Sequence, residues 1–111
     1  MVTPIDTLVP LWEHHFMRIV SNRAIREFAR KHNQSLAPLN YWLYIAKAAD
    51  WRSPADVRRD LNGVDFVGDL VVFDIGGNKY RLIAIVNYRT HIVFIRHILT
   101  HKEYGKGAWK T

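Results

Sequence analysis

The stretch KYRLIAIVNYRTHIVFIRHIL, residues 79–99, decides the fold. It contains two runs dominated by β-branched and other apolar residues, 79–88 and 91–99, and only Arg89 and Thr90 separate them. Runs of this composition joined by two residues are typical of antiparallel strands connected by a tight turn. We therefore predict a β-hairpin over this stretch.

Shorter strands are predicted before the hairpin at 64–67 and 70–75. Gly76-Gly77-Asn78 is expected to form the turn that leads into the hairpin. Met17 to Val20 is a further short strand candidate. The C-terminal half of the chain therefore predicts an antiparallel meander.

Helices are predicted between the first strand candidate and the meander. Ser21 or Asn22 can cap a first helix, and Ser35 can cap a second, each followed by apolar residues at helical spacing. Ser53-Pro54 predicts a third, brief helical turn. The predicted fold class is α+β, with two N-terminal helices packed on a small, mainly antiparallel β-sheet.

A chain of 111 residues, of which 49% are hydrophobic, can close one core. We expect one domain at 17–111, because residues 1–16 contain two prolines and no sustained period. This N-terminal extension could be absent from the native protein, since a start at Met17 leaves a complete domain, or it could form a short surface helix. Neither a membrane span nor a secretory signal is supported, so we expect a soluble, cytoplasmic protein.

Charge and cysteine content narrow the chemistry. The chain has no cysteine, which excludes disulfides, thiolate nucleophiles and cysteine-bound zinc. Sixteen Lys and Arg against ten Asp and Glu give a net charge of +6. Such a field attracts polyanions, and nucleic acid is the leading partner class. A basic balance that serves only solubility is the alternative.

Two arginines interrupt the apolar faces of the hairpin. Alternation along the first run places Arg81 on one face with Ile83 and Ile85, and alternation along the second run places Arg96 with Phe94. A guanidinium in such a position needs an anionic partner for its five donors. The partner is either a phosphate or, as the alternative, the carboxylate of Asp69, Asp74 or Glu103. A further alternative is that the arginine is simply exposed near a strand end.

The polar segment THKEY, residues 100–104, directly follows the last predicted strand. His101 can titrate near neutrality, Lys102 carries a positive charge, and Glu103 can accept a proton or orient a neighbour. Tyr104 can donate from its phenol or stack on a base. Cleavage of RNA without a metal needs an acid, a base and cations, which this segment supplies. A solvated polar loop that caps the sheet is the alternative.

Other motifs give no site. His97 and His101 are four residues apart, but no third ligand is evident, so we predict no metal site and no other cofactor. Gly76-Gly77 is too short for a phosphate loop, and no helix follows it.

Three segments in this order resemble the HigB toxins of bacterial type II toxin–antitoxin systems. They are FDIGGNKYR at 73–81, Ile95-Arg96, and THKEY at 100–104, and the resemblance covers roughly residues 17–110. Many members of that family have Asp after the terminal Tyr, where this chain has Gly105. This departure puts the anchoring of the tail in question.

The resemblance implies a RelE-like fold and ribosome-dependent cleavage of messenger RNA. It also implies neutralisation by a HigA-type antitoxin with a helix-turn-helix domain, through which alone operator DNA would be contacted. Arg81 and Arg96 would hold the scissile phosphate, and His101 and Tyr104 would be the acid–base and stacking groups, supported by Glu103. RNA-binding residues would be Lys79, Lys102 and His97, together with Arg23, Arg26, Arg30 and Lys31, which would meet ribosomal RNA or acidic antitoxin residues.

The leading hypothesis is a metal-independent endoribonuclease toxin that inhibits translation. Attack by the ribose 2′-hydroxyl would leave a 2′,3′-cyclic phosphate or its hydrolysed product. The alternative is a basic RNA-binding module that blocks translation without cutting, and a third possibility is an inert structural subunit of a regulatory complex.

Overall fold

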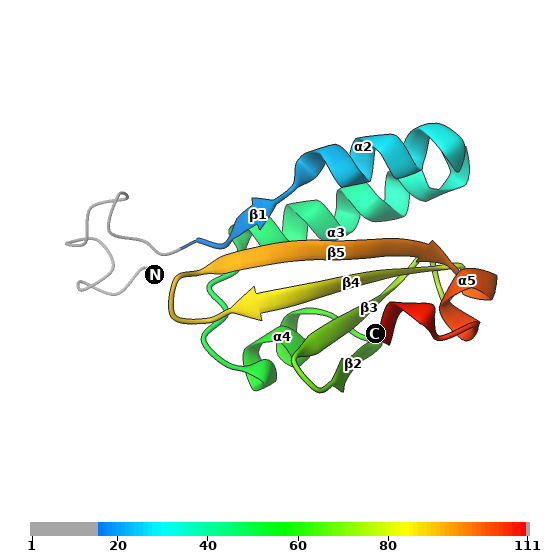
Figure 1. The fold of residues 1–111 in the computed structure, drawn as a ribbon. Coiled ribbons are helices and arrows are strands. Elements are labelled where there is room, and N and C mark those ends of the chain that lie inside the picture. Colours follow the sequence, from blue (N-terminus) through cyan, green and yellow to red (C-terminus); the bar gives the residue numbers. More distant parts are fainter. Residues whose placement is uncertain (1–15, 111) are drawn as a thin grey trace.

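The computed structural model describes residues 16–110, so the predicted extension lies outside the described residues except for Phe16. The fold is α+β, with a five-stranded mixed sheet in the order β1-β5-β4-β3-β2 (Figure 1). The elements are β1 (Arg18–Val20), α2 (Asn22–Lys31), α3 (Leu36–Ala48), α4 (Pro54–Asp60), β2 (Val64–Val67), β3 (Leu70–Ile75), β4 (Tyr80–Asn87), β5 (Ile92–Thr100) and α5 (His101–Gly105), with 3₁₀ turns at Asn33–Ser35 and Ala108–Lys110.

The predicted meander is confirmed, because β2, β3, β4 and β5 pair antiparallel in sequence order. The strand candidate at Met17 to Val20 is also confirmed as β1, which pairs parallel with the start of β5. None of the helices in the described part of the chain has the length and apolar character needed to cross a lipid bilayer.

The helix starts follow the sequence in one case and depart from it in another. Ser21 caps α2, and its side chain accepts a hydrogen bond from the Arg23 amide at 3.1 Å. Ser35 occupies the N-cap position of α3, as predicted, but its side chain makes no capping hydrogen bond. Ser35 lies in the 3₁₀ turn with helical backbone angles. Its buried hydroxyl donates to the carbonyl of His32, three residues earlier, at 2.7 Å and therefore does not accept from the first turn of α3.

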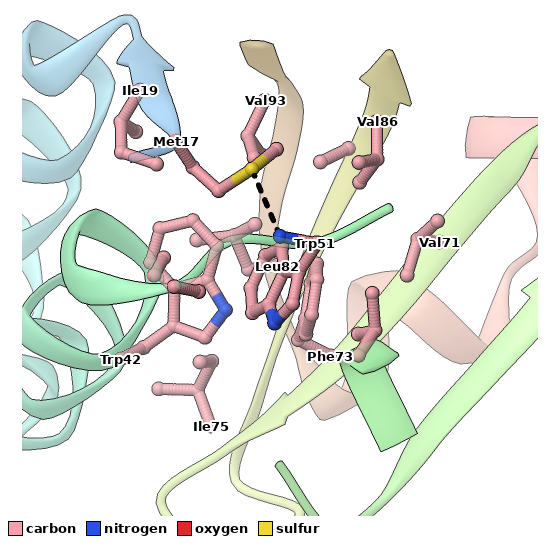
Figure 2. Packing of buried hydrophobic residues seen from close by; sticks show 14 of the residues in the cluster. Met17, Ile19, Trp42, Trp51, Val71, Phe73, Ile75, Leu82, Val86 and Val93 are labelled. Carbon is pink, nitrogen blue, oxygen red and sulfur yellow. Dashed lines mark hydrogen bonds between the residues drawn. The ribbon is translucent and has the colours of Figure 1, made fainter. Parts of the chain in front are cut away.

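The core lies between the helices and one face of the sheet (Figure 2). Trp51 is fully buried, and its ring stacks on Phe73 of β3 with the centroids 6.0 Å apart. Trp42 of α3 meets the same phenylalanine edge-on at 5.3 Å. The Trp51 indole donates to Asp60 of α4 at 2.9 Å, and its amide donates to the Met17 sulfur at 3.3 Å. Through its indole ring and its backbone amide, Trp51 therefore joins α4, β3 and the residue before β1.

The two faces of the sheet have different covers. On the helix face, Leu82 and Ala84 of β4 are buried in the core under the helices. On the opposite face, which we call the tail face, Ile83 of β4 and Val72 of β3 pack against Trp109 from the C-terminal tail. The faces of β4 are therefore as alternation predicts.

The faces of β5 differ from those that alternation predicts, because β5 contains a β-bulge. Ile83 pairs with His97 and Ala84 pairs with Ile95, so Arg96 is an extra residue on β5. An inserted residue shifts the alternation by one position. The prediction that regular alternation holds across 91–99 is therefore wrong beyond Ile95, and the bulge brings His97 to the same face as Phe94, whose partner is Ile85.

Replacing Trp51 by Ala should lower the free energy of unfolding by about 3–5 kcal/mol, because it leaves a cavity at a fully buried position and removes the hydrogen bond to Asp60. Tyr44→Ala is the control, since Tyr44 is 73% exposed on α3 and its loss should change stability by no more than about 0.5 kcal/mol. Urea unfolding measures both, and equal losses would contradict the assignment of Trp51 as the centre of the core.

Candidate functional site

Thr100 of the THKEY segment ends β5, and the remaining residues form a short helix, α5, instead of a loop. Thr100 is the N-cap, and its hydroxyl accepts from the Glu103 amide at 3.2 Å. The Glu103 carboxylate in turn accepts from the Thr100 amide at 2.9 Å. This is a complete capping box, and its signature, Thr followed three residues later by Glu, is present in the sequence.

α5 is also tied to the turn before β4. The amide of His101 donates to the carbonyl of Lys79 at 3.0 Å, so the helix begins beside the GGNK turn. The side chains of His101, Lys102 and Lys79 are all exposed.

Arg81 is buried beneath this helix on the tail face, with only 9% of its surface exposed. Its Nε lies 3.0 Å from the carboxylate of Asp74 on the neighbouring strand. One terminal nitrogen donates to the carbonyls of Asn78 and Tyr80, at 3.0 and 3.3 Å. The structure therefore supplies Arg81 with the carboxylate partner that the sequence left open among three.

A stack of flat groups holds the tail against Arg81. The guanidinium carbon lies 4.9 Å from the Tyr104 ring centroid, and the Tyr104 and Trp109 rings are stacked at 4.9 Å with an angle of 10°. The Trp109 indole donates to the Tyr104 carbonyl at 2.8 Å. Because Trp109 also packs on Val72 and Ile83, it fixes the tail to the sheet.

Two hollows open on the tail face beside this stack, and His97 and Trp109 line both. The first has a volume of about 340 Å³ and is also lined by Glu103 and Lys106. The second has a volume of about 450 Å³ and is also lined by Arg96 and Lys110, with Asp69. The sequence-predicted residues gathered here are Arg96, His97 and Glu103. Lys106 and Lys110 were missed, because single lysines near a chain end carry no pattern.

The other predicted RNA-binding residues lie elsewhere. Arg23, Arg26, Arg30 and Lys31 are exposed on α2, and Arg23 forms an ion pair with Glu27 at 2.8 Å. Lys31 lines a third hollow, of about 310 Å³, between α2 and β5, where Arg96 is again part of the wall. His101 lines none of these three hollows. Among residues 16–110, no three His, Asp or Glu side chains come together as a metal site.

The pKa of Glu103 is lowered from its ordinary value of 4.5, mainly because the Thr100 amide donates to its carboxylate. A lowered pKa means that the capping bond stabilises the fold fully above the ordinary pKa and is lost as the pH falls through the lowered one. The Thr100 amide resonance should therefore shift below about pH 4.5 in ¹H–¹⁵N spectra.

Glu103→Gln should abolish this titration, because the glutamine side chain does not titrate in that pH range. Glu27→Gln on α2 is the matched control and should leave it intact. A Thr100 shift that persists in Glu103→Gln would show that another group causes it.

Comparison with known proteins gives the family. The HigB toxin family, described as a RelE-like toxic component of a toxin-antitoxin system, matches residues 35–107. The chain is 31% identical over 93 residues to the mRNA interferase HigB of Escherichia coli O6:H1 strain CFT073, covering 81% of this chain and 90% of the relative. It is 25% identical over 91 residues to the mRNA interferase toxin HigB of Escherichia coli K12, covering 79% and 88%.

The family match at residues 35–107 includes the GGNK turn, β4, β5 and α5, and it ends before Trp109. The chain belongs to the HigB family of RelE-like toxins of toxin–antitoxin systems.

Proposed function

We propose that this protein is an endoribonuclease toxin that cleaves messenger RNA on the ribosome and so inhibits translation in the cytoplasm. The relatives that bear the name mRNA interferase support this activity. We also propose that α2 and α3 are the two N-terminal helices of a RelE-like fold, and that the antitoxin implied by the family is of the HigA type with a helix-turn-helix domain.

The observation that carries the proposal is the grouping on the tail face. His97 lies between two hollows, with Lys106 beside one and Arg96 and Lys110 beside the other. The Tyr104–Trp109 stack forms the adjoining wall. A titratable imidazole, several cations and a phenol are the groups that cleavage of RNA by its own 2′-hydroxyl requires.

The proposed reaction uses general acid–base catalysis. His97 or His101 accepts the proton of the 2′-hydroxyl, the bond from O2′ to phosphorus forms, and the bond from phosphorus to O5′ breaks. Tyr104 or the other histidine returns a proton to the leaving O5′, so that a 2′,3′-cyclic phosphate remains. Arg96 and Lys106 stabilise the extra negative charge on the phosphorane-like transition state.

Arg81 and Glu103 act through their neighbours in this scheme. Arg81 holds the Tyr104 ring in place by the cation–π contact, while Asp74 fixes the guanidinium. Glu103 fixes the start of α5, and its lowered pKa makes it a weak proton acceptor near neutrality.

Primer extension in a reconstituted translation reaction tests the activity. The wild-type protein should create new messenger 5′ ends, and these ends should disappear when ribosomes are omitted. A His101→Ala, Tyr104→Ala double variant should create none. Ends that form without ribosomes would contradict the proposed ribosome dependence.

Tyr104→Phe separates chemistry from packing. Phenylalanine keeps the ring between Arg81 and Trp109 and removes only the hydroxyl, so the unfolding free energy should stay within about 0.5 kcal/mol. The cleavage rate should fall by roughly 10²–10⁴-fold if the phenol transfers a proton. A variant as fast as the wild type would leave Tyr104 with a packing role only.

A non-catalytic RNA-binding module is the second candidate. It is favoured by the engagement of Arg81 with Asp74 and of Glu103 with Thr100, which leaves fewer groups for catalysis. Translation arrest without new 5′ ends in the primer extension would establish this alternative and exclude the nuclease.

A further inference from the structure

The C-terminal tail covers only part of the tail face. In Figure 1 the tail stays close to the end of β5 and does not reach the β4–β5 turn. Two apolar side chains on the uncovered part are exposed, Phe94 of β5 by 39% and Val67 of β2 by 37%. Phe94 pairs with Ile85, and Val67 pairs with Leu70, whose side chain packs against the tail-face cluster.

The hollow of about 450 Å³ lies over this uncovered part and is lined by both Val67 and Ile85. Its volume falls within the range of sites that hold small organic groups. Arg96 and Lys110 contribute cations to its wall, and Asp69 contributes a carboxylate. Phe94 lies beside this hollow, because its pairing partner Ile85 is part of the wall. An exposed aromatic ring beside an apolar hollow with cations in its wall is an arrangement that binds single-stranded nucleic acid, since bases stack while phosphates pair with cations.

We propose that Phe94 and the hollow beside Ile85 bind a nucleobase of the RNA strand next to the cleaved phosphate. This inference rests on the proposed function and adds a second contact for the same strand. Phe94 stacks on the base, and Arg96 and Lys110 hold the adjoining phosphate.

The position of the hollow explains why one strand reaches both places. His97 and Trp109 line this hollow and also the hollow beside Lys106, so the two adjoin. The carboxylate of Asp69 repels a phosphate, and therefore the sugar–phosphate backbone runs along the Arg96 and Lys110 side. A protein partner would find an apolar strip here as well, but it would gain nothing from the cations unless it were acidic.

Binding is measured by fluorescence anisotropy with a labelled 2′-O-methyl oligoribonucleotide of mixed sequence. The methyl group blocks attack by the 2′-oxygen, so binding is read without cleavage. Phe94→Leu keeps an apolar side chain and removes the aromatic ring, and it should weaken binding by roughly tenfold or more. Phe94→Tyr should restore the affinity. Tyr44→Ala, an exposed aromatic on α3, should bind like the wild type.

Salt dependence separates the base contact from the phosphate contact. Arg96→Gln should reduce the slope of log affinity against log salt by about 0.7, the value for one phosphate contact on a single strand. Phe94→Leu should leave that slope unchanged, because stacking releases no counterion. Urea unfolding of Phe94→Leu confirms that the variant is folded.

The outcomes distinguish the two proposals. Equal affinity of Phe94→Leu and the wild type, or no binding by the wild type, overturns the base platform and leaves the strip to a protein partner. Weaker binding by Phe94→Leu, with the affinity restored in Phe94→Tyr, supports it. If the wild type binds the oligomer through Phe94 but creates no messenger ends on ribosomes, the platform stands and the nuclease proposal fails.

Discussion

The ion pair between Arg81 and Asp74 is the contact on which the tail face depends. Arg81 is almost fully buried, and a guanidinium in that position is tolerated only because a carboxylate and two carbonyls satisfy its donors. Removing the Asp74 carboxylate would leave this guanidinium without its ion-pair partner. Tyr104 lies against the fixed cation and Trp109 stacks on Tyr104, so the ion pair and the packing of Trp109 on the sheet together place the tail.

The two arginines of the hairpin, Arg81 and Arg96, lie in different surroundings. A phosphate at Arg81 would have to compete with Asp74 at 3.0 Å and displace the Tyr104 ring. Among residues 16–110 Arg96 forms no ion pair, and the bulge sets it at an exposed position in the walls of two hollows, one beside α2 and one beside Trp109. In the proposed function, Arg96 therefore meets the substrate, and Arg81 orders the surrounding side chains.

Much of the fold could be predicted because its signals are local. The strand limits follow from β-branched runs and turn residues. Ser21 caps α2 by accepting a hydrogen bond from the amide of Arg23, only two residues further along the chain. The bulge could not be predicted, because it depends on the register between β4 and β5 and not on either strand alone. The helix α5 was not predicted, although its capping box, Thr100 with Glu103, is a local signal in the sequence.

The candidate site was predicted at the end of β5, and three of its predicted residues, Arg96, His97 and Glu103, line the hollows there. The contacts that complete it could not be predicted. His97 lies on the tail face because of the bulge in β5. Trp109 lies there because the chain turns back toward the sheet after α5. Both are contacts between segments that no local pattern connects. Because of the bulge and the returning tail, one face of the mixed sheet carries cations, an imidazole and stacked rings, while the core covers the opposite face.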